Sequence, residues 1–251
     1  MRQSYYNVHT MRRLVGLICV FALITACSRR PDPLQAFPRI VLWAWERPDD
    51  LRFIDPQQTG IAFLARTIDL HDGEATVRPR VETVRFPSST ALMAVVRVES
   101  IRPPLPRPAI VASEIATVAR LDRVRAVQID FDARKSERGW YADVIHQVRS
   151  SVGTHIALSI TALASWCEDD PWIRDLPVDD AVPMLFRMGA GERWTGPDFS
   201  VPLCRSSVGL STDELPDRVP PQMRGRRLFV FHPASWSPDS YRGVNQVARR
   251  W

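Results

Sequence analysis

The feature that most constrains the fold is a series of eight short apolar runs that recur along the chain. They are four to nine residues long and rich in β-branched residues, which is typical of buried strands. Several are followed by segments with helical spacing, and this alternation is typical of parallel sheets. Eight such strands predict an α/β fold, a (β/α)8 TIM-like barrel. The predicted strands are residues 40–46, 60–68, 91–98, 126–132, 155–162, 181–188, 207–210 and 227–232.

The clearest helical segment begins near Ser136, which we expect to be its N-cap. Two further helical patterns cover residues 108–121 and 239–251. Residues 69–86 read instead as a β-hairpin that turns at Asp72-Gly73, where a regular barrel has a helix. We therefore expect an irregular barrel in which a β-hairpin replaces one helix. The strand pattern over residues 203–215 is weak. An open doubly wound sheet is therefore the competing architecture.

The N-terminal region reads as an export signal. Two arginines precede an apolar segment over residues 14–24, which is shorter than the roughly 20 residues of a membrane span. The sequence ITAC at 24–27 resembles the lipobox of bacterial lipoproteins. That resemblance implies a signal peptide over 1–26 and an acylated Cys27 as lipid anchor. An ordinary cleaved signal or an uncleaved anchor is the alternative, and either Met1 or Met11 is the start.

The signal divides the chain into three parts: the signal over 1–26, a proline-rich tether over 27–39, and one TIM-like barrel domain over 40–251. Ser28 follows the lipobox where an aspartate would favour the inner membrane, so the resemblance implies the outer membrane in a Gram-negative cell. The predicted location is therefore the cell envelope.

Charge argues against a nucleic-acid partner. The whole chain has a formal net charge of +5, and loss of the signal's three arginines leaves +2. Lys135 is the one lysine among 33 basic residues, so each arginine is weak evidence of function. Arg224, Arg226 and Arg227 are interpreted as solvated turn charges.

Two cysteines remain in the predicted domain, Cys167 and Cys204. In an exported protein such a pair predicts a disulfide, and two unpaired buried thiols are the alternative. The chain has no CxxC, HExxH or GxSxG motif, and Gly189-Ala190-Gly191 does not form a dinucleotide loop. We predict no metal and no cofactor.

The segment RAVQIDFDARKSERGWY at 125–141 contains the main candidate site. Val127, Ile129 and Phe131 alternate with polar residues, so Asp130 and Asp132 share the other face of the strand. In a barrel, active groups gather at the carboxyl ends of the strands, where Asp132 is the best-placed acid. Glycoside hydrolysis needs two carboxyl groups, and we predict that Asp132 pairs with Glu46 or Glu214.

Other strand-end residues favour a carbohydrate ligand, because indole rings stack on sugar faces. The candidate binding residues are Trp45, Trp166, Arg187, His232, Trp236 and Asp130. Structural roles compete with each of these. Asp130 could pair with Arg66 or Arg187, Asp132 could cap the helix near Ser136, and the tryptophans and His232 could fill the core.

A resemblance to a known family is carried by VLWAWERPDDL, RAVQIDFDARKSERGWY, LSITALASWC and AVPMLFRMG. In these stretches the chain is similar to the exported bacterial proteins of domain-of-unknown-function family 3142. The resemblance implies a barrel like those of sugar-cleaving enzymes. Chitinase-like glycosidases are also similar in placing alternate acids on a central strand, but they continue to a glutamate where this chain has Arg134, and Glu137 is expected to point elsewhere.

Two functions remain open from the sequence. The first is an envelope lipoprotein with a glycoside-hydrolase-like barrel that cleaves a polysaccharide. The second is a non-catalytic lipoprotein that binds a glycan or an envelope partner. Both predict a membrane contact through the lipid anchor and a carbohydrate as a candidate ligand.

Overall fold

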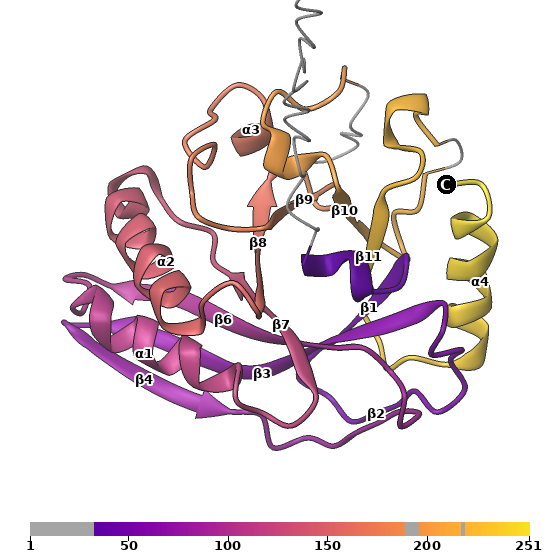
Figure 1. Cartoon of the computed structure of the whole chain (residues 1–251), viewed down its shortest axis with the longest axis horizontal. Coiled ribbons are helices and arrows are strands. Elements are labelled where there is room, and N and C mark those ends of the chain that lie inside the picture. Colours follow the sequence, from indigo (N-terminus) through magenta and orange to yellow (C-terminus); the bar gives the residue numbers. More distant parts are fainter. Residues whose placement is uncertain (1–32, 189–195, 217–218) are drawn as a thin grey trace, which may run out of the picture. The chain divides into compact units, whose positions relative to one another are not determined.

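A closed barrel of eight parallel strands forms the centre of the computed structural model, which describes residues 33–188, 196–216 and 219–251. The strands follow one another around the barrel in the order β1-β11-β10-β9-β8-β7-β6-β3, and pairing of β1 with β3 closes it (Figure 1). All eight predicted strands are present, so the barrel is confirmed and the open sheet is wrong. The strands are β1 (Ile40–Ala44), β3 (Thr59–His71), β6 (Leu92–Arg102), β7 (Val124–Asp130), β8 (Ala157–Leu163), β9 (Asp180–Met184), β10 (Ser207–Ser211) and β11 (Arg227–Phe231).

The predicted hairpin is also present. The strand β4 (Glu74–Pro79) runs antiparallel to the end of β3 after a turn at Asp72 and Gly73, whose φ angles are 52° and 84°. The first half of β3 pairs with β1, and its second half pairs with β4 along the same edge. The short strands β2 (Asp49–Asp50) and β5 (Val84–Arg85) form a separate two-stranded parallel sheet.

Regular alternation of strands and helices is not observed in the described residues. The helix α1 (Pro108–Val118) follows β6, α2 (Arg138–Val152) follows β7, and α4 (Pro238–Ala248) follows β11. The helix α3 (Ala164–Cys167) after β8 is a single turn. Outside the barrel, α1 and α2 pack side by side (Figure 1). Short 3-10 turns occupy other positions, namely η1 (Pro33–Ala36), η2 (Lys135–Glu137), η3 (Pro202–Cys204) and η4 (Pro221–Met223).

The start of α2 differs from the prediction. The turn η2 precedes it, so Ser136 does not cap the helix, and Glu137 is the residue that flanks its first turn. The carboxylate of Glu137 accepts the backbone N–H of Arg134 at 2.8 Å. The alternative in which Asp132 caps this helix is therefore wrong, because the Glu137 carboxylate accepts the backbone N–H there.

Two hydrophobic cores follow from the alternation of side chains along the strands. One lies between the strands and the helices and contains Val127, Ile129 and Phe131. The other fills the barrel and includes Val41, Trp43 and two residues before β1, Leu34 and Phe37. Leu34 (0% exposed) and Phe37 (5%), both within the predicted tether over 27–39, belong to this inner core.

A polar layer crosses the barrel above the inner apolar residues. The Trp43 indole N–H donates to Gln128 Oε1 at 2.8 Å, and the Gln128 amide donates to Ser159 Oγ at 3.2 Å. All three side chains are buried, so each hydrogen bond offsets a desolvation cost. On the opposite wall, Gly209 leaves room for the Trp43 ring.

The contact between Gly209 and Trp43 gives a stability prediction. A Cβ at Gly209 would lie 3.0 Å from Trp43 Cη2, which requires the ring or the strand to move. We expect Gly209→Ala to lower the free energy of unfolding by about 1 to 3 kcal/mol, measured by urea denaturation. The control is Gly139→Ala, because a Cβ at that position on α2 meets no atom within 4 Å. Equal stability of the two variants would contradict the tight packing.

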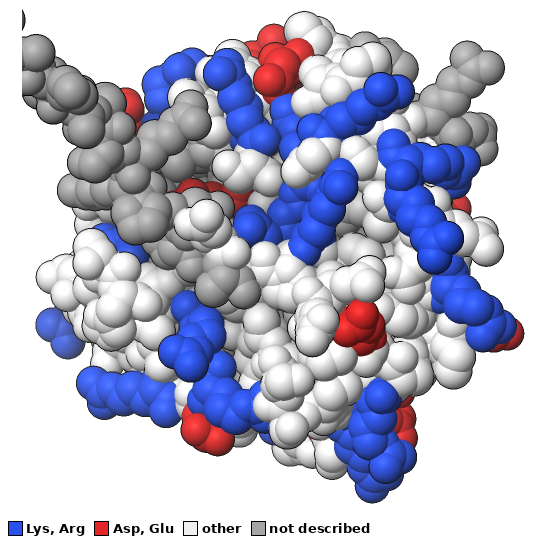
Figure 2. All heavy atoms as spheres, turned by 45° about the vertical axis from the view of Figure 1, so that its right-hand side comes forward, with Lys and Arg blue, Asp and Glu red and all other residues white. Residues whose placement is uncertain are grey.

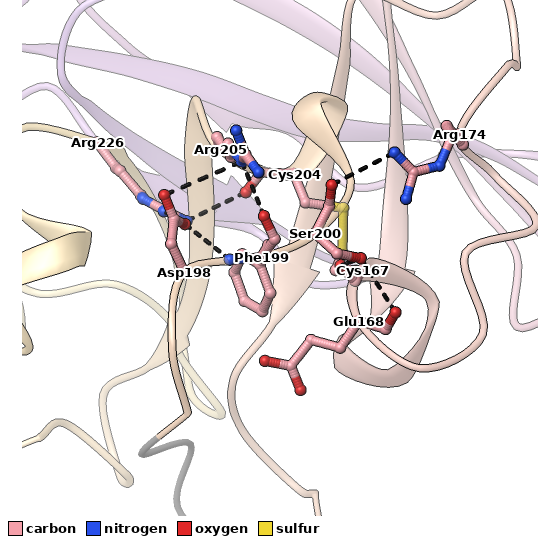
Figure 3. The surroundings of a disulfide bond; sticks show 9 residues. All are labelled: Cys167, Glu168, Arg174, Asp198, Phe199, Ser200, Cys204, Arg205 and Arg226. Carbon is pink, nitrogen blue, oxygen red and sulfur yellow. Dashed lines mark hydrogen bonds and ion pairs between the residues drawn. A yellow bond between two sulfur atoms is a disulfide. The ribbon is translucent and has the colours of Figure 1, made fainter.

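The predicted disulfide between Cys167 and Cys204 is confirmed, and two free thiols are excluded. It joins the end of α3 to η3, and both residues are fully buried. The loop before η3 is held at the same point, because the Ser200 hydroxyl donates to the Cys167 carbonyl at 3.1 Å (Figure 3). The Val201 N–H donates to the same carbonyl at 3.1 Å. The bond therefore fixes the segment after β8 against the segment before β10.

The prediction that Arg224, Arg226 and Arg227 are solvated turn charges is wrong for two of the three. Arg226 is 5% exposed, pairs with Asp198 and donates to the Cys204 carbonyl at 3.1 Å (Figure 3). Arg227 donates to the Leu34 carbonyl at 2.7 Å. Elsewhere, basic side chains are spread over the face that Figure 2 displays, with few acidic ones between them.

The predicted membrane elements lie outside the described residues, namely the signal over 1–26 and Cys27. Among the helices of the described residues, none has the length and apolarity needed to cross a membrane.

Candidate functional site

A cavity of about 520 Å³ opens at the carboxyl ends of the barrel strands. Residues at the ends of β7, β8, β9 and β11 line it, namely Asp130, Leu163, Met184 and Phe231. This is the end at which barrel proteins place their active sites, because the loops there surround a pocket. The cavity is therefore the candidate site.

The two acids reach the cavity because of the alternation along β7. Val127 and Ile129 point into the outer core, so Gln128 and Asp130 point into the barrel. Asp132 follows the strand on the same side, and it also lines the cavity. The prediction that Asp130 and Asp132 share the polar face is confirmed.

The surroundings of Asp130 favour its protonated form. Burial raises its pKa to about 6, while the hydrogen bond from Thr161 Oγ1, 2.7 Å from Oδ1, acts in the opposite direction. The negative charge of Asp132 raises the pKa of Asp130 further, and Arg97 lowers it. The pKa of Asp132 is also raised, by partial burial, but this side chain is the more exposed of the two. The pair thus contains a deep carboxyl that is about half protonated at pH 6 and a second carboxyl nearer to solvent.

Neither acid is neutralised by an ion pair with an arginine of the described residues. The expected partner Arg66 pairs with Glu114 at 2.7 Å instead. Arg97 lies opposite Asp130 in the register of β6 and β7, but its guanidinium pairs with Glu99 at 2.6 Å. The predicted pairing of Asp130 with Arg66 or Arg187 is therefore wrong, and the carboxyl groups are available to a ligand.

One wall of the cavity is aromatic. Phe186 and Phe231 stack with their planes 3° apart and their centroids 5.9 Å apart. Trp45 meets Phe231 edge-on at 6.4 Å, and the Arg97 guanidinium lies 5.8 Å from the Trp45 ring. Flat apolar rings beside carboxyl groups form a surface that suits a sugar ring.

A smaller cavity of about 200 Å³ adjoins the first and shares Arg97, Asp130 and Asp132 with it. Glu137 lines this cavity, which corrects the expectation that it points elsewhere. It is 6% exposed and accepts the Ser100 hydroxyl at 2.6 Å, so it is held by the scaffold. Arg134, the residue in place of the glutamate of chitinase-like sequences, also lines this cavity.

The two acids predicted as partners of Asp132 do not line either cavity. Glu46 accepts the Thr67 hydroxyl at 3.3 Å, and Glu214 accepts the backbone N–H of Arg187 at 2.9 Å. Asp130, which the sequence placed among the binding residues, is instead the acid that accompanies Asp132.

Three predicted ligand-binding residues support the barrel wall. Trp166 is 2% exposed and packs on Trp172 in the outer core. Trp236 is 6% exposed and donates from Nε1 to the Trp43 carbonyl at 2.9 Å. His232 shares a hydrogen bond with Thr212 at 2.6 Å, and burial lowers its pKa. Trp166 and Trp236 belong to the outer core and His232 lies beside the Trp236 ring, whereas Trp45 and Arg187 line the cavity.

Sequence reasoning missed Arg97, Phe186 and Phe231 as cavity residues. Each continues the inward-facing side of its strand by two positions, after Val95, Met184 and Phe229. Applying the period-2 pattern through to the carboxyl end of each predicted strand would have found all three.

No group of three or more His, Cys, Asp and Glu side chains that could hold a metal ion is present in the described residues.

Comparisons with known proteins found little. No family model and no curated protein sequence matches the chain. A search of solved structures found the crystal structure of the chitinase domain of the spore coat protein CotE from Clostridium difficile, with a TM-score of 0.45 and 13% sequence identity. The match covers 85% of this chain and 63% of that chain, so this chain spans less than two thirds of its length.

The raised pKa of Asp130 gives a second prediction. Its carboxyl binds a proton more tightly in the folded protein (pKa about 6) than at the ordinary value of 3.8, so protonation stabilises the fold. This stabilisation is complete below pH 3.8 and is lost as the pH rises through about 6, and a shift of this size is worth up to about 3 kcal/mol.

We therefore expect Asp130→Asn, which cannot ionise, to match wild type near pH 4 and to be more stable at about pH 7.5. Urea denaturation across this pH range measures the difference. The exposed Asp143→Asn on α2 is the control, and it should show no pH-dependent difference from wild type. A constant difference between Asp130→Asn and wild type would contradict the burial of this carboxyl.

Proposed function

We propose that the chain is a glycoside hydrolase that cleaves a polysaccharide, with Asp132 as a catalytic carboxylate. The observation that carries this proposal is the pair Asp130 and Asp132 in one open cavity, without an arginine clamp and beside an aromatic wall. Glycosidases need two carboxyl groups, one protonated and one ionised.

The two environments suggest how the roles divide. Asp130 retains a proton near pH 6 because it is buried, and we assign it as the group that donates a proton to the leaving oxygen. Asp132, nearer to solvent, is assigned as the ionised carboxylate that faces the sugar. The Cα atoms of residues two apart on an extended chain are about 6.6 Å apart, so carboxyl groups on two such side chains can reach the separation of about 5 to 10 Å that glycosidases use.

The aromatic wall supports a sugar as the ligand. Trp45 and Phe231 present ring surfaces within the same cavity as the acids. Such rings stack on the apolar faces of sugars and would orient a polysaccharide across the carboxyl groups.

A non-catalytic glycan-binding function is the second candidate. It is favoured by Arg134, which stands where chitinase-like sequences have the proton-donating glutamate, and by the positions of Glu46 and Glu214 outside the cavity lining. In that case the aromatic wall binds a glycan that the acids do not cleave.

A screen of full-length protein, purified in detergent, against envelope and extracellular polysaccharides tests both functions. We expect new reducing ends from at least one polysaccharide. If none appears, and a glycan array detects binding that survives Asp132→Asn, the binding function replaces the enzymatic one.

We also propose that the chain is an exported lipoprotein of the cell envelope, anchored through Cys27, and that it belongs with the family of unknown function that it resembles. The basis is the lipobox-like ITAC sequence at 24–27. Labelling of cells with radioactive palmitate should mark wild type and not Cys27→Ala. Label on both would refute the anchor.

A further inference from the structure

The cavity contains an arginine whose backbone conformation is unusual. Arg187 lies shortly after β9 and has a φ of +55°, a region that non-glycine residues rarely adopt. Its backbone N–H donates to Glu214 Oε2 at 2.9 Å, so the loop after β10 holds the loop after β9. Strained residues of this kind are concentrated at ligand sites, where the surrounding structure holds them in place.

The side chain of Arg187 is positioned by the aromatic wall. Its guanidinium carbon lies 5.3 Å from the centroid of Phe231, which is itself packed against Phe186 and Trp45. A guanidinium that lies over a ring keeps its in-plane N–H groups free for a ligand. The aromatic wall therefore holds the N–H donors of the Arg187 guanidinium at a defined position in the cavity.

The two arginines of the cavity differ in their partners. Arg97 already pairs with Glu99, whereas the guanidinium of Arg187 has no hydrogen bond or ion pair to any described residue. Asp213 is close enough for Arg187 to lower the pKa of its carboxyl, but no ion pair joins the two. Among the described residues, Arg187 is thus a charged donor without an acceptor, at the edge of the candidate site.

We infer that the cavity binds a sugar chain that carries carboxylates, of the uronic acid class, and that Arg187 binds one carboxylate through its fork of N–H groups. This inference rests on the proposed function, because the cavity is the same. The planar fork of arginine matches a carboxylate in a bidentate manner. Glu214, predicted as a catalytic acid, becomes a positioning residue that holds the Arg187 backbone.

The distance between strands places this carboxylate away from the acids. β7 and β9 are separated by β8, so their axes lie about 10 Å apart. A carboxylate at Arg187 therefore belongs to a different sugar ring from the one that faces Asp130 and Asp132. Repulsion between the substrate and the catalytic acids is reduced by this separation.

Calorimetric titration in the Asp132→Asn background tests the inference without cleavage. The probes are an oligouronate, the same oligosaccharide with its carboxylates reduced to alcohols, and a sulfated neutral oligosaccharide. We expect reduction to weaken binding about 10- to 100-fold, the effect of losing a charge-assisted bidentate contact. Arg187→Ala should weaken oligouronate binding by the same factor and leave binding of the reduced probe unchanged.

Two further variants separate recognition from folding. Arg187→Lys retains the charge without the fork and should lose part of the affinity, and Glu214→Gln should weaken binding only when Arg187 is present. Arg242→Ala on α4, exposed and far in sequence from the cavity, is the control and should bind as before.

Equal affinity for the oligouronate and its reduced form would overturn the inference, as would an equal loss for both probes in Arg187→Ala. Preference for the sulfated probe would overturn the carboxylate class. These failures are distinct from failure of the proposed function, which would appear as no release of reducing ends by the wild-type protein.

Discussion

Asp132→Asn is expected to reduce the release of reducing ends by about 100- to 10,000-fold, the range found when a group that acts directly on the reacting bond is lost. The amide keeps the size and shape of the side chain but cannot become a carboxylate. Because partial burial raises the pKa of Asp132 and this side chain forms no ion pair with the described residues, replacing it with a neutral amide should not destabilise the fold. Initial rates of reducing-end formation measure the effect.

Asp143→Asn is the matched control, since Asp143 is an exposed acid on α2 outside both cavities. It should cleave at the wild-type rate. If Asp132→Asn retains wild-type activity, another residue does the chemistry and the assignment of this carboxylate is wrong.

The pH dependence of the rate provides a check on the partner acid. Asp130 can donate a proton only while it is protonated, and its pKa is about 6. Activity should therefore fall as the pH rises through about 6, and Asp130→Asn should abolish this limb together with most of the activity. A rate that is flat between pH 5 and pH 8 would exclude Asp130 as the acid.

The barrel could be predicted because strand periodicity is a local property. Alternation at Val127, Ile129 and Phe131 determined which way Asp130 and Asp132 point without reference to the remaining chain. The eight runs were predicted from their short length and their β-branched residues, which are also local properties, and each became a strand. The hairpin at Asp72-Gly73 was equally local, because turn chemistry is encoded in two adjacent residues.

The residues that accompany Asp132 in the cavity could not be predicted in the same way. Glu46 and Glu214 stand just beyond strands, as Asp132 does, but a side chain past the last strand residue no longer follows the period of the strand. Trp166 lies in a helix that packs its ring on Trp172, a contact that depends on where the chain folds back. Long-range packing therefore decided which polar and aromatic residues face the cavity.

Loss of the disulfide should have the largest effect on stability. Cys167 and Cys204 are 37 residues apart, and opening a loop of this length costs about 4 kcal/mol on the chain-entropy account. The double variant Cys167→Ala/Cys204→Ala should therefore unfold at a markedly lower urea concentration than wild type. The control is a strong reductant, which should destabilise wild type by a similar amount and leave the variant unchanged. Equal stability of the oxidised wild type and the variant would show that native packing alone holds the loop.

The same variant should also alter the candidate site. Ala164 and Ser165 line the large cavity and lie within three residues of Cys167 on α3. The disulfide and the hydrogen bonds to the Cys167 carbonyl fix this turn against the loop before η3 (Figure 3). Without the bond the turn gains freedom that a ligand must then restrict, so we expect weaker glycan binding even where the barrel remains folded. Unchanged affinity, measured by titration well below the unfolding transition, would show that the strands alone position this wall.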